Sequence, residues 1–387
     1  MKVVIACDVL GEKNNGTSMA SYNLINYLKS KGHEVTVICS DSDKKGQEGF
    51  VIVDKLNLGP LLNPILAKNG VSLTKKVKNN KEFEKVIKNS DIVHCILPFS
   101  LGISACKTAK KYGKPVTAGF HCQAENVTSH FGVMNSSVIN KTVYKVFHNK
   151  FYQYVDGIHY PTEFIRENYE NVVGKTNGYV ISNGVNSYVR PMPCEKPENL
   201  KDKFVILTTG RLSKEKMQGV LIKAISKSKH NKDIQLIMAG AGPFKERLIR
   251  KSKKLVNPPI IQYFTREEMI KLLNYADLYV HPAEIELEGI ACLEACVCGL
   301  VPVVSDSKRA ATKNFALTEN NKFKCNDADD LAKRIDYWIE HPQERAACQE
   351  QYIKYSAVLD QDECMDKMEK MMFDVINKTK DKGSVWK

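Results

Sequence analysis

The sequence predicts an α/β protein built from two doubly wound domains that face a cleft. Three observations carry this prediction: short apolar segments recur along the chain, each is followed by a helical pattern, and the rhythm starts again past the middle. A chain of 387 residues has room for two or three domains of about 150 residues each. No continuous apolar stretch approaches the ~20 residues of a membrane-spanning helix.

The first half of the chain has the order strand, helix, strand. The apolar run Lys2–Cys7 is typical of a buried strand, a helical face with Leu24 and Leu28 follows, and Gly32 ends that helix before the strand Glu34–Cys39. The same order returns in three further segments, which are 91–97, 102–112 and 115–120. This order indicates βαβ units and a parallel sheet.

The second half repeats the pattern after a predicted hinge. Asn183-Gly184 and the Pro- and charge-rich run 191–203 separate the two cycles. The predicted strands are 204–209, 234–239, 278–281 and 303–305, and the predicted helices are 218–227, 267–275 and 290–297. A helical tail starts at Ala328. We therefore expect an N-terminal domain over 1–187, a C-terminal domain over 188–365, and a helix and tail over 366–387 that return to the first domain.

Charge and cysteine content narrow the function classes. Lys and Arg total 57 against 44 Asp and Glu, and the net charge of +13 favours an anionic partner: nucleic acid, an acidic membrane face or a phosphorylated substrate. The twelve cysteines are dispersed, and Cys296 with Cys298 is one residue short of a C-x-x-C motif. We expect buried, reduced thiols in a cytosolic protein.

The strongest functional signal is the segment 281–307, where a strand ends, an acidic loop follows and a helix begins near Gly289. Glu286 lies in the loop and Glu294 lies within the helix. Ligands of open α/β sheets bind at the carboxyl ends of the strands, so one carboxylate would accept hydrogen bonds from a sugar and the other from a ribose. The N–H groups of Gly289 and Ile290 would favour an anion. The alternative is a helix whose first turn is acidic because of its macrodipole.

A second signal is the segment 208–224, which places Arg211 and Lys216 in a loop between a strand and a helix. Two fixed cations at the start of a helix suit a diphosphate that gains charge as it leaves. The alternative is an ordinary basic surface loop. Because this loop and the acidic segment are expected at the same edge of one sheet, a shared site is favoured.

Weaker candidates stand alone in their segments. The loop Asn14-Asn15-Gly16 would let the backbone approach a phosphate, although it lacks the G-x-G-x-x-G pattern. His121 follows a predicted strand and could contact a sugar hydroxyl or the acceptor, but a single histidine there is more often structural. His94 is interpreted as a core histidine, and Gly240 with Gly242 as a tight turn.

Two basic segments, 74–88 and 140–154, interleave lysines with apolar or aromatic residues. Both patterns are typical of amphipathic helices that bind anionic lipid headgroups. The lysines expected on the membrane and acceptor side are Lys75, Lys76, Lys78, Lys81, Lys145 and Lys150. The alternative for either segment is a solvated helix face over an ordinary core.

The order and spacing of the motifs resemble the retaining glycosyltransferases of sequence family 4, which have the two-domain GT-B fold. The resemblance covers nearly the whole chain through GHEVTVIC, DIVHCILP, FHCQ, ISNGVN, TGRLSKEK, MAGAGP and the Glu286 to Glu294 block followed by CGLVPVV. The segments FHCQAEN and ELEGIACLEA also resemble those of bacterial diacylglycerol glucosyltransferases. Such enzymes generally need no metal, so the resemblance implies no cofactor beyond the nucleotide-sugar donor.

The resemblance also implies roles at the phosphate and at the reacting carbon. Arg211 and Lys216 would hold the donor diphosphate, and Gly16 would approach it from the N-terminal domain. His121 would line the acceptor side near the reacting carbon. With Glu286, it is the residue expected to be catalytic.

For the donor sugar and nucleoside, the resemblance implies that Glu286 binds sugar hydroxyls and Glu294 binds the ribose. The amides of Gly289 and Ile290 would contact the sugar or the phosphate. The chain departs from its relatives at Glu288, where they usually have Phe, and this change adds a carboxylate beside the expected donor pocket. It also lacks the glycine common after the strand near 261–264.

These features together predict a hexosyltransferase that moves glucose from UDP-glucose to diacylglycerol or a similar membrane lipid, with retention. Such an enzyme would bind peripherally to the inner, cytoplasmic face of an anionic membrane. The alternative acceptor is a soluble or cell-wall precursor. Outside the enzymes, the alternatives are a basic nucleic-acid-binding protein, against which Glu286 and Glu294 argue, and an inactive sugar-nucleotide sensor.

Overall fold

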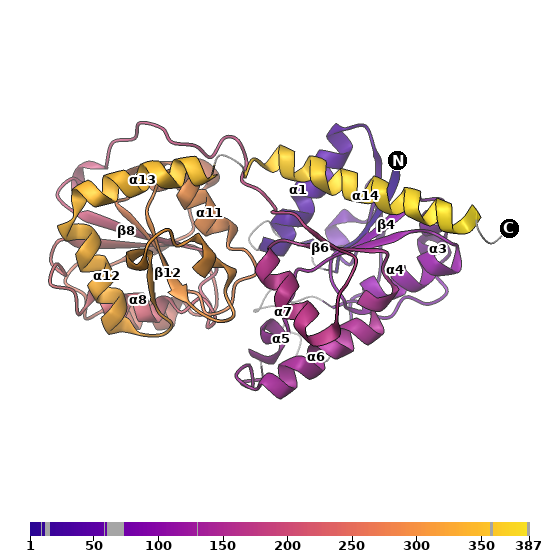
Figure 1. Ribbon diagram of the computed structural model, residues 1–387, viewed down its shortest axis with the longest axis horizontal. Coiled ribbons are helices and arrows are strands. Elements are labelled where there is room, and N and C mark those ends of the chain that lie inside the picture. Colours follow the sequence, from indigo (N-terminus) through magenta and orange to yellow (C-terminus); the bar gives the residue numbers. More distant parts are fainter. Residues whose placement is uncertain are drawn as a thin grey trace. The chain divides into compact units, whose positions relative to one another are not determined.

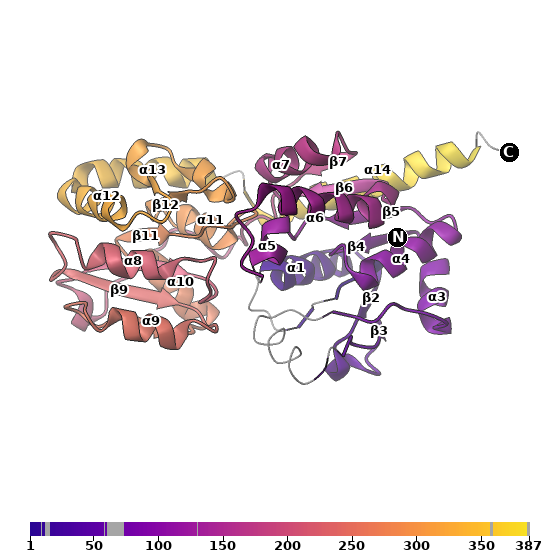
Figure 2. The ribbon, with the colours of Figure 1, turned by 90° about the horizontal axis from the view of Figure 1, so that it is seen from below.

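The computed structural model describes residues 1–8, 10–11, 16–57, 59, 73–129, 131–356 and 359–384. The chain divides into two compact units (Figures 1 and 2). Unit 1 comprises Met1–Asn183 with Asp362–Lys387, and unit 2 comprises Gly184–Gln361. The divisions fall at 183/184 and 361/362, where the sequence predicts 187/188 and 365/366.

Unit 1 contains a parallel sheet of seven strands within the described residues, in the order β3-β2-β1-β4-β5-β6-β7. Its strands are β1 (Lys2–Ala6), β2 (Glu34–Cys39), β3 (Phe50–Ile52), β4 (Ile92–Cys95), β5 (Val116–Gly119), β6 (Gly157–Tyr160) and β7 (Gly178–Val180). The central strands are buried on both faces, which is why they read as continuous apolar runs.

The helices of unit 1 follow the strands in the predicted alternation. They are α1 (Gly16–Ser30), α3 (Lys81–Lys88), α4 (Ser100–Lys111), α5 (Ala124–Ser129), α6 (Ser137–Lys150), α7 (Glu163–Val173) and α14 (Gln361–Ser384). The last of these, yellow in Figure 1, returns to unit 1 and contacts α1 and the turn after it. There Tyr27 donates a hydrogen bond to Asp366, and Nε2 of His33 lies 2.5 Å from Oε1 of Glu369.

The prediction of a helix over 74–88 is wrong for its first half, because α3 begins only at Lys81. Asn79 adopts a positive φ of 52°, which interrupts a right-handed helix. The side chain of Asn80 then caps α3 by accepting a hydrogen bond from the N–H of Phe83 at 3.0 Å. Of the lysines expected on the membrane side, Lys75, Lys76 and Lys78 therefore precede the helix.

Unit 2 contains a second parallel sheet, of six strands within the described residues, in the order β10-β9-β8-β11-β12-β13. Its strands are β8 (Phe204–Thr209), β9 (Ile234–Ala239), β10 (Ile260–Gln262), β11 (Leu278–His281), β12 (Pro302–Asp306) and β13 (Lys322–Lys324). Its helices are α8 (Gln218–Ile225), α9 (Lys245–Ser252), α10 (Arg266–Tyr275), α11 (Ile290–Val297), α12 (Ala328–Glu340) and α13 (Pro342–Ser356). Together the two units confirm the predicted doubly wound α/β architecture.

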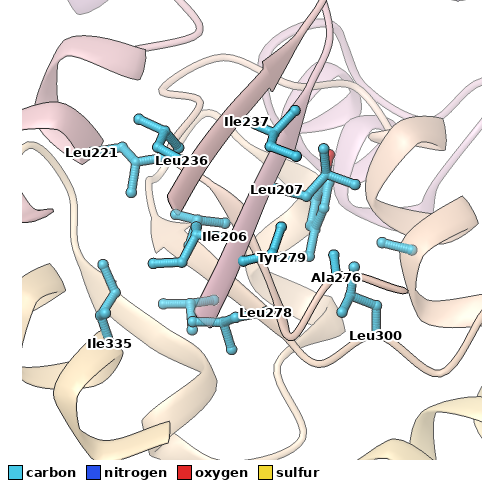
Figure 3. Close-up of a cluster of buried hydrophobic side chains, with 14 of the residues drawn as sticks. Ile206, Leu207, Leu221, Leu236, Ile237, Ala276, Leu278, Tyr279, Leu300 and Ile335 are labelled. Atoms are coloured by element: carbon cyan, nitrogen blue, oxygen red, sulfur yellow. The ribbon is translucent and has the colours of Figure 1, made fainter. Parts of the chain in front are cut away.

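The core of unit 2 lies between this sheet and its helices. Ile206, Leu236 and Leu278 are buried side by side on β8, β9 and β11, and Leu221 of α8 and Ile335 of α12 belong to the same buried cluster (Figure 3). Burial of a side chain of this size contributes roughly 1.5–3 kcal/mol to stability. A rigid sheet of this kind fixes the positions of the loops at its carboxyl edge.

Candidate functional site

The centre of the candidate site in unit 2 is Glu286, whose side chain lies between Lys216 and His281. Its Oε2 accepts a hydrogen bond from Nζ of Lys216 and lies 3.0 Å from Nε2 of His281. Lys216 comes from the loop after β8, and His281 is the last residue of β11. The backbone of Glu286 pairs with Ala310 in an isolated parallel bridge, which fixes the acidic loop. The sequence predicted Lys216 and Glu286 at one sheet edge, and the structure places them in direct contact.

A hydrogen-bonded chain supports this centre from beneath. Thr209 at the end of β8 contacts the hydroxyl of Tyr279 at 2.8 Å, and that hydroxyl lies 3.2 Å from Nδ1 of His281. His281 in turn contacts Glu286, which contacts Lys216. The carboxylate is therefore oriented through two strands that are neighbours in the sheet. In the sequence, His281 is recognisable only as the end of a strand, because the sheet brings its partners together.

The charges of this centre follow from its contacts. Burial opposes ionisation of Glu286, but Lys216 and His281 outweigh burial and lower the pKa of Glu286 to about 2. Burial lowers the pKa of His281, although Glu286 acts in the opposite direction. At neutral pH the centre is therefore an ammonium and a carboxylate with a neutral imidazole. Such a group offers one cation to an anion and one acceptor to a hydroxyl.

The loop that carries Arg211 and Lys216 rests on a second loop that contains Gly240 and Gly242. A Cβ atom at Gly242 would lie 2.4 Å from the carbonyl oxygen of Leu212, so only glycine allows this contact. The sequence predicts a tight turn at Gly240 and Gly242, and in the structure these glycines let two backbone segments approach closely. The carbonyl of Arg211 accepts a hydrogen bond from Nε2 of Gln218 at 2.8 Å, and burial lowers the pKa of the guanidinium.

Glu294 lies in α11 and belongs to a different ion pair from Glu286. Its Oε1 accepts a hydrogen bond from Nη2 of Arg266 at 2.6 Å. The Arg266 guanidinium also lies over the ring of Tyr188, 5.1 Å from its centre. The structure thus assigns separate partners to the two carboxylates. No sequence motif points to Arg266, because its partner Glu294 is 28 residues away in the sequence.

The start of α11 adjoins Glu286. Gly289 has a φ of 88°, and a Cβ atom there would lie 2.3 Å from Cγ2 of Thr312. Ile290 is the first residue of α11, as the sequence predicts. Glu288, the departure from the family pattern, is buried.

In unit 1, Gly16 and His121 follow β1 and β5. Gly16 begins α1 and is exposed, while Asn14 and Asn15 lie outside the described residues. A Cβ at Gly119 would lie 2.5 Å from the His121 ring, so this glycine makes room for the imidazole. The ring centres of His121 and His159 are 5.6 Å apart. Burial, with the nearby imidazoles, holds the pKa of His121 well below its usual range, so His121 is neutral at pH 7.

His94 is a core histidine, as predicted. It is buried on β4, and its Nδ1 lies 3.0 Å from the hydroxyl of Thr117 on β5. All twelve cysteines are thiols, and most of them are buried. Over the described ranges, no group of three or more His, Cys, Asp and Glu side chains is arranged to hold a metal ion. No helix in the same ranges is long and apolar enough to cross a membrane.

The two basic segments differ at the surface. The four lysines at 75–81 are exposed, but the large apolar side chains of α3, Phe83 and Ile87, are buried in the core. Lys145 and Lys150 of α6 are exposed together with several large apolar side chains. These exposed apolar residues, on α6 and just before it, are Phe131, Val133, Val138, Ile139 and Val146. They and Lys141, Lys145 and Lys150 are called the α6 surface below.

Comparison with known families decides what kind of protein carries this site. Residues 14–187 match the family described as Glycosyltransferase Family 4, and residues 194–355 match Glycosyl transferases group 1. The chain belongs to the GT-B glycosyltransferases. The group 1 match in this glycosyltransferase contains Arg211, Lys216, Glu286 and Glu294.

Individual relatives of this glycosyltransferase agree with the assignment. It is 23% identical over 322 residues to alpha-monoglucosyldiacylglycerol synthase of Streptococcus pneumoniae, covering 79% of this chain and 71% of the relative. It is 30% identical over 164 residues, 41% of each chain, to GDP-mannose-dependent alpha-(1-6)-phosphatidylinositol dimannoside mannosyltransferase of Mycobacterium tuberculosis. The fold matches the crystal structure of Anabaena HepE with UDP and glucose at a TM-score of 0.71 and 15% identity, covering 97% and 99% of the two chains.

Proposed function

We propose that this glycosyltransferase transfers glucose from UDP-glucose to a membrane lipid such as diacylglycerol, with retention at the anomeric carbon. The observation that carries the proposal is the contact of Lys216, Glu286 and His281 at the carboxyl ends of two neighbouring strands. The names of two relatives support a lipid acceptor, since one is a glucosyldiacylglycerol synthase and the other a phosphatidylinositol dimannoside mannosyltransferase.

Each charged group has a part in this reaction. The bond between the anomeric carbon and the phosphate oxygen breaks, and the diphosphate leaves with extra negative charge that Arg211 and Lys216 stabilise. Glu286 accepts hydrogen bonds from hydroxyls of the donor sugar, and its low pKa keeps it an acceptor throughout. The acceptor hydroxyl forms the new bond on the face that the diphosphate leaves, and its proton passes to the departing phosphate oxygen. In this proposal His121, which is neutral at pH 7, contacts a sugar hydroxyl or the acceptor.

In this proposal the α6 surface is the membrane contact, and the enzyme is bound peripherally to the inner, cytoplasmic face. Phe131, just before α6, is 77% exposed and Val138 of α6 is 73% exposed, and Lys145 and Lys150 of α6 are exposed as well. Apolar side chains flanked by lysines suit the interface of an anionic bilayer. The lysines before and on α3 have no exposed large apolar side chain beside them within 73–88, so they contribute charge alone.

Release of nucleotide from a panel of UDP- and GDP-sugars, with and without diacylglycerol in anionic vesicles, tests the donor and the acceptor. Lipid-stimulated release from UDP-glucose is the expected result, and an α-linked product would establish retention. Release that ignores lipid would replace the lipid by a soluble or cell-wall precursor. Absence of release from every donor, with a thermal midpoint raised by DNA and unmoved by UDP or GDP, would reject a glycosyltransferase role.

Sedimentation with phosphatidylglycerol vesicles at low salt tests the α6 surface. Replacing Lys145 and Lys150 by Ala should weaken binding by about tenfold or more, since each lysine near an anionic surface contributes roughly 1 kcal/mol. The matched control replaces Lys81 and Lys85 on α3, both exposed, and should change binding less. Equal losses in the two variants would mean that binding depends on total charge and that α6 has no special part.

A further inference from the structure

Arg266 is fixed by three contacts, one with Glu294 and two with Tyr188. It is the first residue of α10, which lies beside α11 in unit 2 (Figure 2). Nη2 donates a hydrogen bond to Oε1 of Glu294 at 2.6 Å, Nε donates to the hydroxyl of Tyr188 at 3.2 Å, and the guanidinium lies over the Tyr188 ring. Its planar fork is thus fixed in plane and direction, which an ammonium in its place would not be.

Tyr188 is itself anchored by the segment that follows the first crossing between the units. Its N–H donates to Oδ1 of Asn186 at 3.3 Å, and Nδ2 of Asn186 donates to Oε1 of Gln361 at the second crossing at 3.0 Å. A few residues on, the N–H of Met192 donates to Oδ1 of Asn274 on α10 at 2.8 Å. This segment is therefore attached to the helix that carries Arg266.

We infer that Arg266, held by Tyr188, is the positioning residue that orients Glu294 toward the ribose hydroxyls of the donor. This inference rests on the proposed function, because it assumes a nucleotide in unit 2. A carboxylate has about four acceptor positions, so one hydrogen bond to Arg266 leaves acceptor capacity for a hydroxyl. The Glu294 side chain is 16% exposed, which gives a ligand access to it. Fixing the side chain before binding reduces the entropy lost when the hydroxyls bind.

This arrangement predicts a specific signature in nucleotide binding. Wild type should prefer UDP over dideoxy-UDP, which lacks both ribose hydroxyls, by about tenfold to a hundredfold, because hydrogen bonds to a charged group are strong. Arg266→Ala should weaken the binding of UDP by about tenfold and change the affinity for dideoxy-UDP by no more than about twofold. The preference should therefore collapse, as it should in Glu294→Gln. The KM for the donor should rise more than kcat falls.

Graded variants separate positioning from a general structural effect. Tyr188→Phe keeps the ring and removes the hydroxyl contact, so it should lose part of the preference, while Arg266→Lys should restore little of it. Arg247→Ala is the matched control, because Arg247 also lies over an aromatic ring, that of Phe244, in the same unit. This variant should change the affinity for neither nucleotide.

Calorimetric titration of the full chain with the UDP and GDP series decides the question. If Arg266→Ala weakens the binding of UDP and of dideoxy-UDP equally, Arg266 contacts another part of the nucleotide and the inference is wrong. Unchanged binding of UDP would also overturn it. A wild-type protein that binds neither UDP nor GDP would instead reject the proposed function, and the inference with it. Because UDP and GDP share the ribose, the wrong choice of base would not imitate either result.

Discussion

Two carboxylates with little exposure, one at the carboxyl edge of each sheet, have opposite surroundings. Glu286 follows β11 in unit 2 and contacts a lysine, whereas Asp8 follows β1 in unit 1 and accepts a hydrogen bond from the hydroxyl of Thr74 at 2.8 Å. The pKa of Glu286 is lowered to about 2, while burial raises the pKa of Asp8 to about 6 in spite of the Thr74 hydrogen bonds. The carboxyl edge of a sheet therefore holds a carboxylate that stays ionised near neutral pH in unit 2 and one that titrates near pH 6 in unit 1.

The difference extends to the neighbours of these two groups. The strand ends of unit 2 carry ion pairs, which include Lys216 with Glu286 and Arg309 with Glu284. The edge of unit 1 carries His121, and burial keeps its imidazole uncharged at pH 7. The charged edge of unit 2 suits a diphosphate, and the neutral imidazole in unit 1 suits a hydroxyl. The proposed reaction requires both kinds of contact.

The largest effect is expected when the charged edge loses its cation. Lys216→Ala should lower the turnover of sugar transfer by about a hundredfold to a thousandfold, as loss of a fixed donor at a developing charge typically does. Lys214→Ala in the same loop is the matched control, because Lys214 is exposed. Steady-state kinetics with saturating donor measure both. If the two variants lose activity equally, the contact with Glu286 is not what matters.

A smaller loss is expected at His121 in unit 1. His121→Ala should lower turnover by about tenfold to a hundredfold, because it removes a contact and no charge. Since the pKa of His121 lies well below its usual range, its contribution should be constant from pH 6 to pH 8. The ratio of wild-type to variant activity across this range measures it. A ratio that changes with a midpoint near neutrality would show that His121 titrates there.

Acid should weaken the fold through Glu286. The folded pKa of about 2 lies below the usual 4.5, so the unfolded state binds more protons and stability falls as pH drops from about 4.5 toward 2. Glu286→Gln lacks this contribution. Urea midpoints should therefore show a gap between wild type and Glu286→Gln that is widest at pH 6 and narrows at lower pH. Glu284→Gln in the same loop is the control, and a gap that stays constant would contradict the lowered pKa.

Much of the fold could be predicted because its strands are short buried runs with helices between them. The strands Glu34–Cys39, Phe204–Thr209 and Ile234–Ala239 have the predicted bounds. The pattern failed at 74–88, where lysines and apolar residues alternate as in a helix but Asn79 and Asn80 delay its start. A cap depends on local hydrogen bonds that hydrophobic periodicity does not register.

The motifs of the candidate site could be predicted one by one, but the contacts between their side chains could not. Lys216 and Glu286 were expected at the same sheet edge because strands β8 and β11 end there. The partners of Glu294 and the support of His281 by Tyr279 depend on strand order and on helix positions. The contact of Gly242 with the Arg211 loop also depends on backbone proximity, for which a single glycine pair in sequence is too common a signal.

The smallest effect, and the one with the opposite sign, is expected at Asp8. Its folded pKa of about 6 lies above the usual 3.8, so the folded state binds more protons and stability rises as pH falls from about 7 to 4. Within the described residues its Oδ2 is buried without a hydrogen-bond partner, so ionisation there is costly. Asp8→Asn should raise the free energy of unfolding by about 1 kcal/mol at pH 7.5 and by less at pH 5. Asp41→Asn, after the neighbouring strand β2, is the control for loss of a carboxylate. A gain at Asp8 that is the same at both pH values would show that this group does not titrate in the folded protein, and the contrast with Glu286 would then be one of packing alone.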